Sequence, residues 1–119
     1  MTVYNKLIVY QKSRELTVFI YKLTKKFPYH EIQGLTSQIR RAAVSVCLNI
    51  SEGSARSTDK QFYNFINIAI GSITETKVCL EISLDLGYIS KEDHDSAFNQ
   101  SEEISKMLFS LRKSLSADG

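Results

Sequence analysis

The sequence LTSQIRRAAVSVCLNISEGSAR, residues 35–56, decides the fold that we expect for this chain. Read at about 100° per residue, it predicts a helix with three longitudinal stripes, where an ordinary amphipathic helix has two. The first stripe is apolar, with the spacing of three and four that a core-facing seam requires. It consists of Leu35, Ile39, Ala42, Ala43, Val46 and Ile50.

The other two stripes distinguish this helix from a simple surface helix. The second is a polar line formed by Gln38, Arg41, Ser45, Asn49, Glu52 and Arg56. The third is Val44 and Leu48, flanked by the small Ser37 and Ser51, on the side away from the first seam. Because exposed apolar surface tends to mark an interaction site, we expect this helix to be covered on both sides.

The composition is that of one globular domain over residues 1–119, with 43% hydrophobic and 24% charged residues. One proline and five glycines argue against a turn-rich β fold and favour helices. Cys47 and Cys79 lie inside predicted helices without a CxxC pair or a Cys/His cluster, so we expect buried, reduced thiols. The N-terminal residues show no secretory pattern, and we expect a cytoplasmic protein.

Proline and capping residues predict the helix boundaries. A first helix is expected over about residues 5–26 and is ended by Pro28, and a second over 35–55 with Thr36 as its cap. Thr58 with Gln61 forms a capping box for a third helix over 58–86, and a fourth covers 90–115. The short connections predict an all-α, up-down-up-down antiparallel four-helix bundle.

The third predicted helix also has a second apolar face, which consists of Ile68, Gly71, Val78, Cys79, Ile82 and Leu86. We therefore expect the second and third helices to supply the subunit contacts, through Val44, Leu48, Ile68, Ile82 and Leu86. Glu75 lies inside this face, where a carboxylate must find a cation or hydrogen-bond donors. We expect a polar tie to Arg41, within a structural network of Gln38, Arg41, Asn49, Glu52 and Glu75; a catalytic role for Glu75 is the alternative.

The sequence does not show the patterns that catalysis or metal binding usually leaves. His30 and His94 have no nucleophilic partner nearby in sequence, and we expect His94 to be a solvated neighbour of a helix cap. No HExxH pair, phosphate-binding loop or nucleotide-binding glycine motif occurs. Some four-helix ribonucleases place an arginine four to six residues before a catalytic histidine, and neither histidine here has one. We expect no enzymatic activity, no metal and no cofactor.

Charge is distributed unevenly along the chain, whose net charge is +2. Residues 1–60 contain ten Lys/Arg against four Asp/Glu, whereas residues 77–119 contain five against eight. The basic half favours an anionic polymer as a partner, although a solvated surface is the alternative. The candidate nucleic-acid-binding residues are Lys22, Lys25, Lys26, Arg40, Arg56 and Lys60, and the aromatic residues that could stack on unpaired bases are Tyr21, Phe27, Tyr29 and Tyr63.

Three motifs resemble those of the 23S rRNA intervening-sequence protein family. The segment Q-x-x-R-A-x-x-S falls on Gln38, Arg41, Ala42 and Ser45, and N-I-x-E-G falls on Asn49, Ile50, Glu52 and Gly53. The segment A-x-G-S-x-x-E falls on Ala69, Gly71, Ser72 and Glu75, and the Phe27–Pro28 loop also matches. The resemblance extends over nearly the whole chain.

This resemblance implies a closed pentameric ring of four-helix bundles from bacteria, whose genes lie inside insertions in 23S rRNA genes. It also implies kinship with the accessory variability determinant of diversity-generating retroelements, a basic pentamer that binds nucleic acid. We therefore expect a homo-oligomer, with RNA, DNA or a ribonucleoprotein as its partner and no association with membranes. The alternatives are a protein-interaction ring without nucleic-acid binding and, third, an RNA-processing enzyme.

Overall fold

Residues 3–116 are described by a computed structural model, with side chains placed for residues 8–115. Four long helices account for most of the chain: α1 (Val3–Thr24), α2 (Leu35–Ser54), α3 (Asp59–Asp85) and α4 (Lys91–Ser116). A short 3₁₀ helix, η1 (Tyr29–Glu31), lies between α1 and α2. No strand occurs in residues 3–116, which confirms the all-α class.

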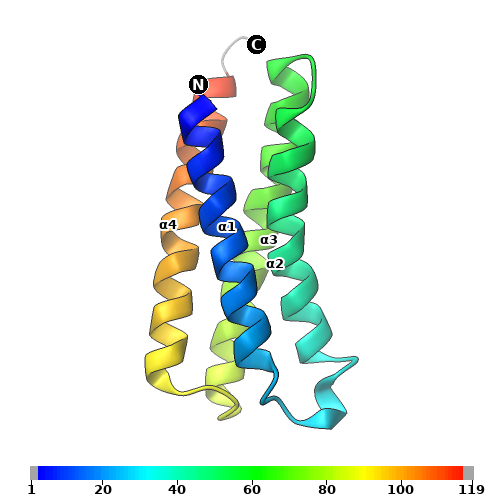
Figure 1. Ribbon diagram of the computed structural model, residues 1–119, viewed down its shortest axis with the longest axis vertical. Helices are drawn as coiled ribbons and strands as arrows, with labels where there is room; N and C mark the ends of the chain where they lie inside the picture. Colours follow the sequence, from blue (N-terminus) through cyan, green and yellow to red (C-terminus); the bar gives the residue numbers. More distant parts are fainter. Residues whose placement is uncertain (1–2, 117–119) are drawn as a thin grey trace.

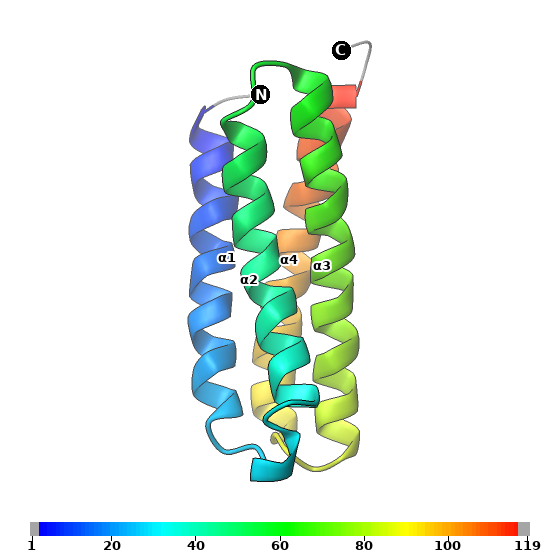
Figure 2. The same cartoon turned by 90° about the vertical axis from the view of Figure 1, so that its right-hand side faces the viewer.

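The four helices lie side by side in a bundle with extents of 46 × 25 × 18 Å (Figure 1). Each of α2 and α4 packs against both α1 and α3, and the chain reverses direction at every connection (Figure 2). Side-chain pairs fix the relative position of α3 and α4: Lys77 contacts Glu102, and Arg112 contacts Asn67. One end of the bundle therefore carries the end of α1 and the start of α2, and the other carries the α2–α3 turn.

The core consists of one apolar seam from each helix. In α2 the predicted first stripe is confirmed, because all its members are buried except Leu35, which packs against the core from its edge. The seams of the other helices converge on it, and the fully buried members include Leu16, Ile20, Ile66, Ile73, Leu80, Ile104 and Leu108. Burial of each such side chain stabilises the fold by about 1.5–3 kcal/mol before the entropy of ordering is subtracted.

Several buried hydroxyl groups are satisfied within their own helix. Ser13 donates to the Val9 carbonyl at 2.7 Å, and Ser83 donates to the Cys79 carbonyl at 2.7 Å. This bond to the carbonyl four residues earlier removes the cost of burying the hydroxyl without using a partner on another helix. These serines therefore act inside the core as small residues that let helices approach.

The predicted Thr58 cap is confirmed, because Thr58 Oγ1 accepts from the Gln61 amide at 3.1 Å. Ser90 caps α4 in the same way, since its Oγ accepts from the Asp93 amide at 3.0 Å. Gly87 has the positive φ of 77° that glycine tolerates best. The predicted Thr36 cap is wrong, because α2 begins at Leu35, whose amide donates to Glu31 Oε1 at 3.0 Å.

Gly53 lies inside α2, at a point where α2 closely approaches α3. A Cβ atom at this position would lie 2.7 Å from Phe62 Cδ1 and 2.7 Å from Phe65 Cβ. The helix continues through Gly53 to Ser54, one residue short of the predicted end at residue 55. Glycine is needed here because of the close approach of two aromatic residues.

We expect Gly53→Ala to lower the free energy of unfolding by about 1–3 kcal/mol, because the added methyl group overpacks the α2–α3 contact. The measurement is urea unfolding followed by circular dichroism at a fixed protein concentration. Gly71→Ala is the matched control, since no atom lies within 4 Å of its Cβ position; it should raise the same free energy by about 0.5–1 kcal/mol. Equal stabilities of the two variants would contradict the close approach.

Candidate nucleic-acid interface

The largest group of unpaired cations lies where α1 ends. Lys22, Lys25 and Lys26 are all exposed, and none of them forms an ion pair within the part of the chain that the structure describes. The helix ends at Thr24, two residues earlier than predicted, because the Phe27 amide donates to the Thr24 carbonyl at 3.1 Å in a tighter turn. We call these three lysines the α1 lysine cluster.

Aromatic packing and one carboxylate hold the loop that follows the α1 lysine cluster. Phe27 is buried, and its ring centroid lies 5.2 Å from that of Tyr88, next to the α3–α4 connection. The Tyr88 hydroxyl donates to Glu31 Oε2 at 2.9 Å, while Glu31 Oε1 accepts from the Leu35 amide. The backbone hydrogen bond from Leu35, followed by the one from Tyr88, lowers the pKa of the Glu31 carboxyl. The same contact raises the pKa of Tyr88.

Arg40 has structural partners on α1. Its Nε donates to Thr24 Oγ1 at 2.8 Å, and its guanidinium carbon lies 4.6 Å from the centroid of the Tyr21 ring. The Tyr21 carbonyl is a further acceptor at 3.4 Å. Arg40 therefore joins α2 to the end of α1, and its contact with nucleic acid stays a prediction.

The six predicted nucleic-acid-binding residues do not form one surface. Lys22, Lys25, Lys26 and Arg40 lie at the end of the bundle where α1 finishes, whereas Arg56 and Lys60 lie at the opposite end, at the α2–α3 turn (Figure 2). Arg56 has its guanidinium carbon 4.9 Å from the centroid of the Phe65 ring. The predicted set is therefore two separate groups of cations.

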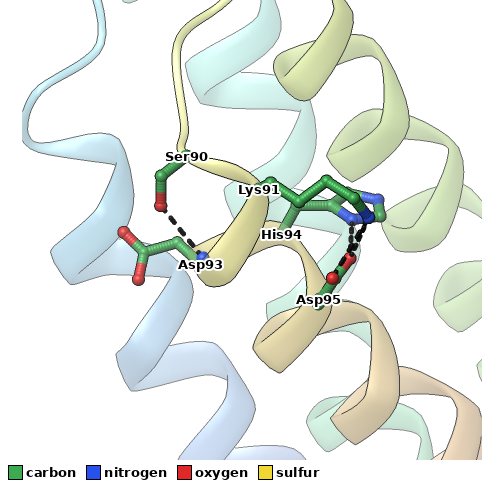
Figure 3. A network of polar contacts seen from close by, with 5 residues as sticks. All are labelled: Ser90, Lys91, Asp93, His94 and Asp95. Atoms are coloured by element: carbon green, nitrogen blue, oxygen red, sulfur yellow. Dashed lines mark hydrogen bonds and ion pairs between the residues drawn. The ribbon is translucent and has the colours of Figure 1, made fainter.

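The end of the bundle where α1 finishes also carries the start of α4, which is acidic. Glu92 and Asp93 lie in the first turn of α4, where they favourably oppose the helix dipole. Asp95 accepts from Lys91 Nζ at 3.1 Å and from His94 Nδ1 at 2.9 Å (Figure 3). The hydrogen bond from His94, followed by the one from Lys91, lowers the pKa of Asp95. The end of the bundle is thus basic along α1 and acidic along α4.

The expectation that His94 is solvated is wrong. The residue is 9% exposed, its ring stacks on Phe98 with centroids 5.3 Å apart, and its Nε2 atom has no hydrogen-bond partner among the described residues. His94 precedes the buried Ala97 by three residues, so it continues the apolar seam of α4. That spacing is the sequence signal that could have placed it in the core.

The predicted pairing of Glu75 with Arg41 is wrong, because Gln38 Nε2 donates to Glu75 Oε2 instead. A second polar contact lies further along the same two helices, where Ser45 Oγ and Ser72 Oγ are 2.8 Å apart and Asn49 Nδ2 donates to the Ser45 carbonyl at 2.8 Å. The polar contacts of the predicted network therefore form two separate groups, one at Gln38 and Glu75 and the other around Ser45 and Asn49.

Arg41 and Glu52, the other members of the predicted network, are exposed. No hydrogen bond or ion pair of either side chain occurs within the described residues. The continuous lattice expected along α2 is therefore absent from this part of the chain, and only Gln38, Asn49 and Glu75 of the predicted members take part in polar contacts.

The second apolar faces of α2 and α3 are largely exposed to solvent in the isolated chain. Leu48, Ile68, Ile82 and Leu86 are among the exposed large hydrophobic residues, whereas Val44 is half-buried. We call these five residues the outer apolar face. Cys79 was predicted to belong to it but is buried in the core instead.

Both cysteines are free thiols, and Cys47 is half-buried with its Sγ atom 3.5 Å from Thr17 Oγ1. Burial raises the pKa of the thiols of Cys47 and Cys79, which reduces the fraction of reactive thiolate. No group of three or more His, Cys, Asp or Glu residues in the described part of the chain is arranged to hold a metal ion. Among the described helices, none has the length and apolarity that crossing a membrane requires.

Sequence and structure comparisons agree on what the chain resembles. The profile of a family described as 23S rRNA-intervening sequence protein matches residues 5–110. The fold is similar to the crystal structure of a protein of unknown function from the S23 ribosomal protein family of Bacteroides thetaiotaomicron, with a TM-score of 0.84 and 33% sequence identity. That match covers 92% of this chain and 98% of the other. No curated protein matches the sequence.

We expect Glu31→Gln to lower the melting temperature at neutral pH, because the carboxylate receives the Leu35 amide and the Tyr88 hydroxyl. The folded-state pKa is lowered from 4.5, so this stabilisation is present above that value and is lost as pH falls through the folded-state pKa. The difference between the parent and the variant should therefore shrink on acidification.

The measurement is thermal unfolding of both proteins over a pH series, with Glu52→Gln in α2 as the control for an exposed carboxylate. A difference that stays constant down to the most acidic pH would contradict this role of Glu31.

Proposed function

Because the chain belongs to the 23S rRNA-intervening sequence protein family, we propose that it is a non-enzymatic homo-oligomer that associates with nucleic acid or a ribonucleoprotein. The observation that carries the proposal is the α1 lysine cluster. Lys12, Lys77 and Lys91 each pair with a carboxylate, whereas the three cluster lysines do not. Unpaired, exposed ammonium groups are what phosphate contacts require.

The outer apolar face supports a second copy of the chain as the oligomer contact. Ile68, Ile82 and Leu86 follow one side of α3 at helical spacing, and Leu48 adds the neighbouring α2. Large apolar side chains that are exposed at this spacing favour a protein contact. The family resemblance supports a closed ring of five antiparallel bundles as the form of the oligomer.

Oligomerisation would strengthen weak binding to a polyanion. Three lysines on one subunit contribute little affinity at physiological salt, but a ring repeats the α1 lysine cluster on every subunit. Once one cluster is bound, the others meet the same polymer at a high effective concentration. The modest charge of +2 per chain is therefore compatible with useful affinity.

The acidic start of α4 favours the alternative function, a protein-interaction ring without nucleic-acid binding. Glu92, Asp93 and Asp95 lie at the same end of the bundle as the α1 lysine cluster and repel phosphate. Recovery of a protein partner from the source cell after nuclease treatment, together with a failure of the purified ring to bind nucleic acid, would favour this alternative.

We expect the triple variant Lys22→Gln, Lys25→Gln, Lys26→Gln to weaken binding to structured RNA and to single-stranded DNA. If each lysine contacts one phosphate, the slope of log K against log salt should become shallower by about 2–3. The measurement is a mobility-shift titration across a salt series.

The matched control is Lys12→Gln, Lys77→Gln, Lys106→Gln, which removes the same charge from positions inside α1, α3 and α4, away from the α1 lysine cluster, and should change the slope less. Absence of binding by the parent protein even at low salt would overturn the proposed function. An equal effect of the two triple variants would overturn the assignment to the α1 lysine cluster.

We expect Ile68→Asp to dissociate the oligomer, because it places a charge in the outer apolar face. Light scattering should change from about five times 13.5 kDa to 13.5 kDa. Val18→Asp on α1 is the matched control, since Val18 and Ile68 are both 53% exposed but only Ile68 belongs to that face. A parent protein that is monomeric at micromolar concentration would refute the oligomer.

A further inference from the structure

A groove between α3 and α4 lies at the end of the bundle opposite the α1 lysine cluster, because its lining residues come from the start of α3 and the last part of α4. It has a volume of about 500 Å³ and is lined by Tyr63 of α3 with Phe109, Arg112 and Lys113 of α4. Two aromatic rings and two cations thus share one concave surface, and no carboxylate is among the lining residues. We call it the α3–α4 groove.

The aromatic part of the groove faces solvent. Phe109 is 47% exposed, although a phenylalanine with no external role is normally better buried. Tyr63 packs partly against the core and is half-buried. The rings therefore offer flat apolar surface that the chain itself does not cover.

Arg112 is held in a fixed position beside these rings. Its guanidinium carbon lies 4.8 Å from the centroid of the Phe109 ring, and its Nη1 donates to Asn67 Oδ1 at 2.9 Å. The guanidinium group has further N–H donors besides the one that Asn67 accepts. A positioned guanidinium stacked on an exposed ring can contact a phosphate while the ring contacts a base.

The surrounding charge also favours an anion. Arg56 and Lys60 lie at the same end, at the turn between α2 and α3 (Figure 2). Among residues 8–115, Asp59 at the first residue of α3 and Glu52 in α2 are the carboxylates near that turn. The positive side chains at this end are Arg56, Lys60, Arg112 and Lys113, and they outnumber these two carboxylates.

We propose that the α3–α4 groove binds an unpaired nucleotide of a single-stranded nucleic acid, with Phe109 and Tyr63 stacking on bases and Arg112 and Lys113 contacting phosphates. A duplex fits less well, because its bases are stacked on each other and leave the rings without partners. An acidic peptide would use the cations but not the exposed rings. The inference rests on the proposed function and assigns it a second surface, which the charge-based prediction did not include.

The test compares Phe109→Leu with Val18→Ala in binding to a labelled single-stranded oligonucleotide, measured by fluorescence anisotropy with RNA and DNA of the same sequence. Val18 is the control because it is an apolar residue of similar exposure, 53% against 47% for Phe109, and lies outside both the α3–α4 groove and the α1 lysine cluster. Phe109→Leu should weaken binding about fivefold to a hundredfold, as loss of one stacked base predicts, and Val18→Ala should not. Weakening with either nucleic acid supports the proposal.

Three further measurements locate the effect. Binding to a duplex of the same length should be unchanged by Phe109→Leu. Arg112→Lys, which keeps the charge and loses the flat guanidinium, should weaken single-strand binding in the same direction. An oligonucleotide containing 4-thiouridine should crosslink to the tryptic peptide 107–112 or to the peptide 61–77. Thermal unfolding of each variant verifies that the bundle stays folded.

The outcomes separate this proposal from the proposed function. If the parent protein binds the oligonucleotide and Phe109→Leu binds it equally well, the groove assignment is overturned while nucleic-acid association stands. A mononucleotide that binds as tightly as the oligonucleotide would also overturn it, because the ligand would then be a free nucleotide. If the parent binds no nucleic acid at all, the proposed function fails first and the groove assignment fails with it.

Discussion

The close contact between α2 and α3 is the constraint on which the rest of the structure depends. At Gly53 the two helices approach so tightly that even a methyl group would meet Phe62 and Phe65. Along the same contact, Ser45 and Ser72 meet through hydroxyl groups, and Gln38 binds Glu75. Small and hydrogen-bonding residues thus replace the large apolar side chains that would hold the helices further apart.

This contact determines what each helix presents to its surroundings. With the first stripe of α2 in the core, and with Gln38 and Ser45 in contact with α3, Leu48 is left on the outside. Ile68 on α3 is exposed as well. The two polar contacts, Gln38–Glu75 and Ser45–Ser72, fix the position of α2 relative to α3. They therefore also fix where the exposed side chains of the two helices lie relative to each other. A weakly packed pair of helices would leave the same residues exposed but without a fixed arrangement.

The sequence predicted the elements well because the signals for them are local. The seam from Leu35 to Ile50 and the Thr58 cap depend on residues three or four positions apart, and both are present as expected. Contacts between helices were harder to predict. Glu75 was predicted to pair with Arg41 because of their opposite charges, whereas the rotation and axial position of the two helices place Gln38 beside it. The rotation of one helix relative to another cannot be predicted from the spacing of residues along the sequence.

The candidate site shows the same limit. Six cations were grouped because they lie in the first half of the chain, but the length of α2 separates Arg40 from Arg56, which follows its end, so that they lie at opposite ends of the bundle. Phe109 and Arg112 were not predicted as site residues, because they lie outside that basic half. Only the fold reveals that they share a groove with Tyr63.

The uneven charge at the α1 end gives the molecule a transverse electric dipole, with lysines along α1 and carboxylates at the start of α4. Because α1 and α4 are neighbours in the bundle, such a dipole would turn an approaching polyanion towards the lysines before any contact forms. The torque would act over a Debye length, which is about 30 Å in dilute buffer and about 8 Å at physiological ionic strength. Salt would therefore govern the direction from which a polyanion approaches.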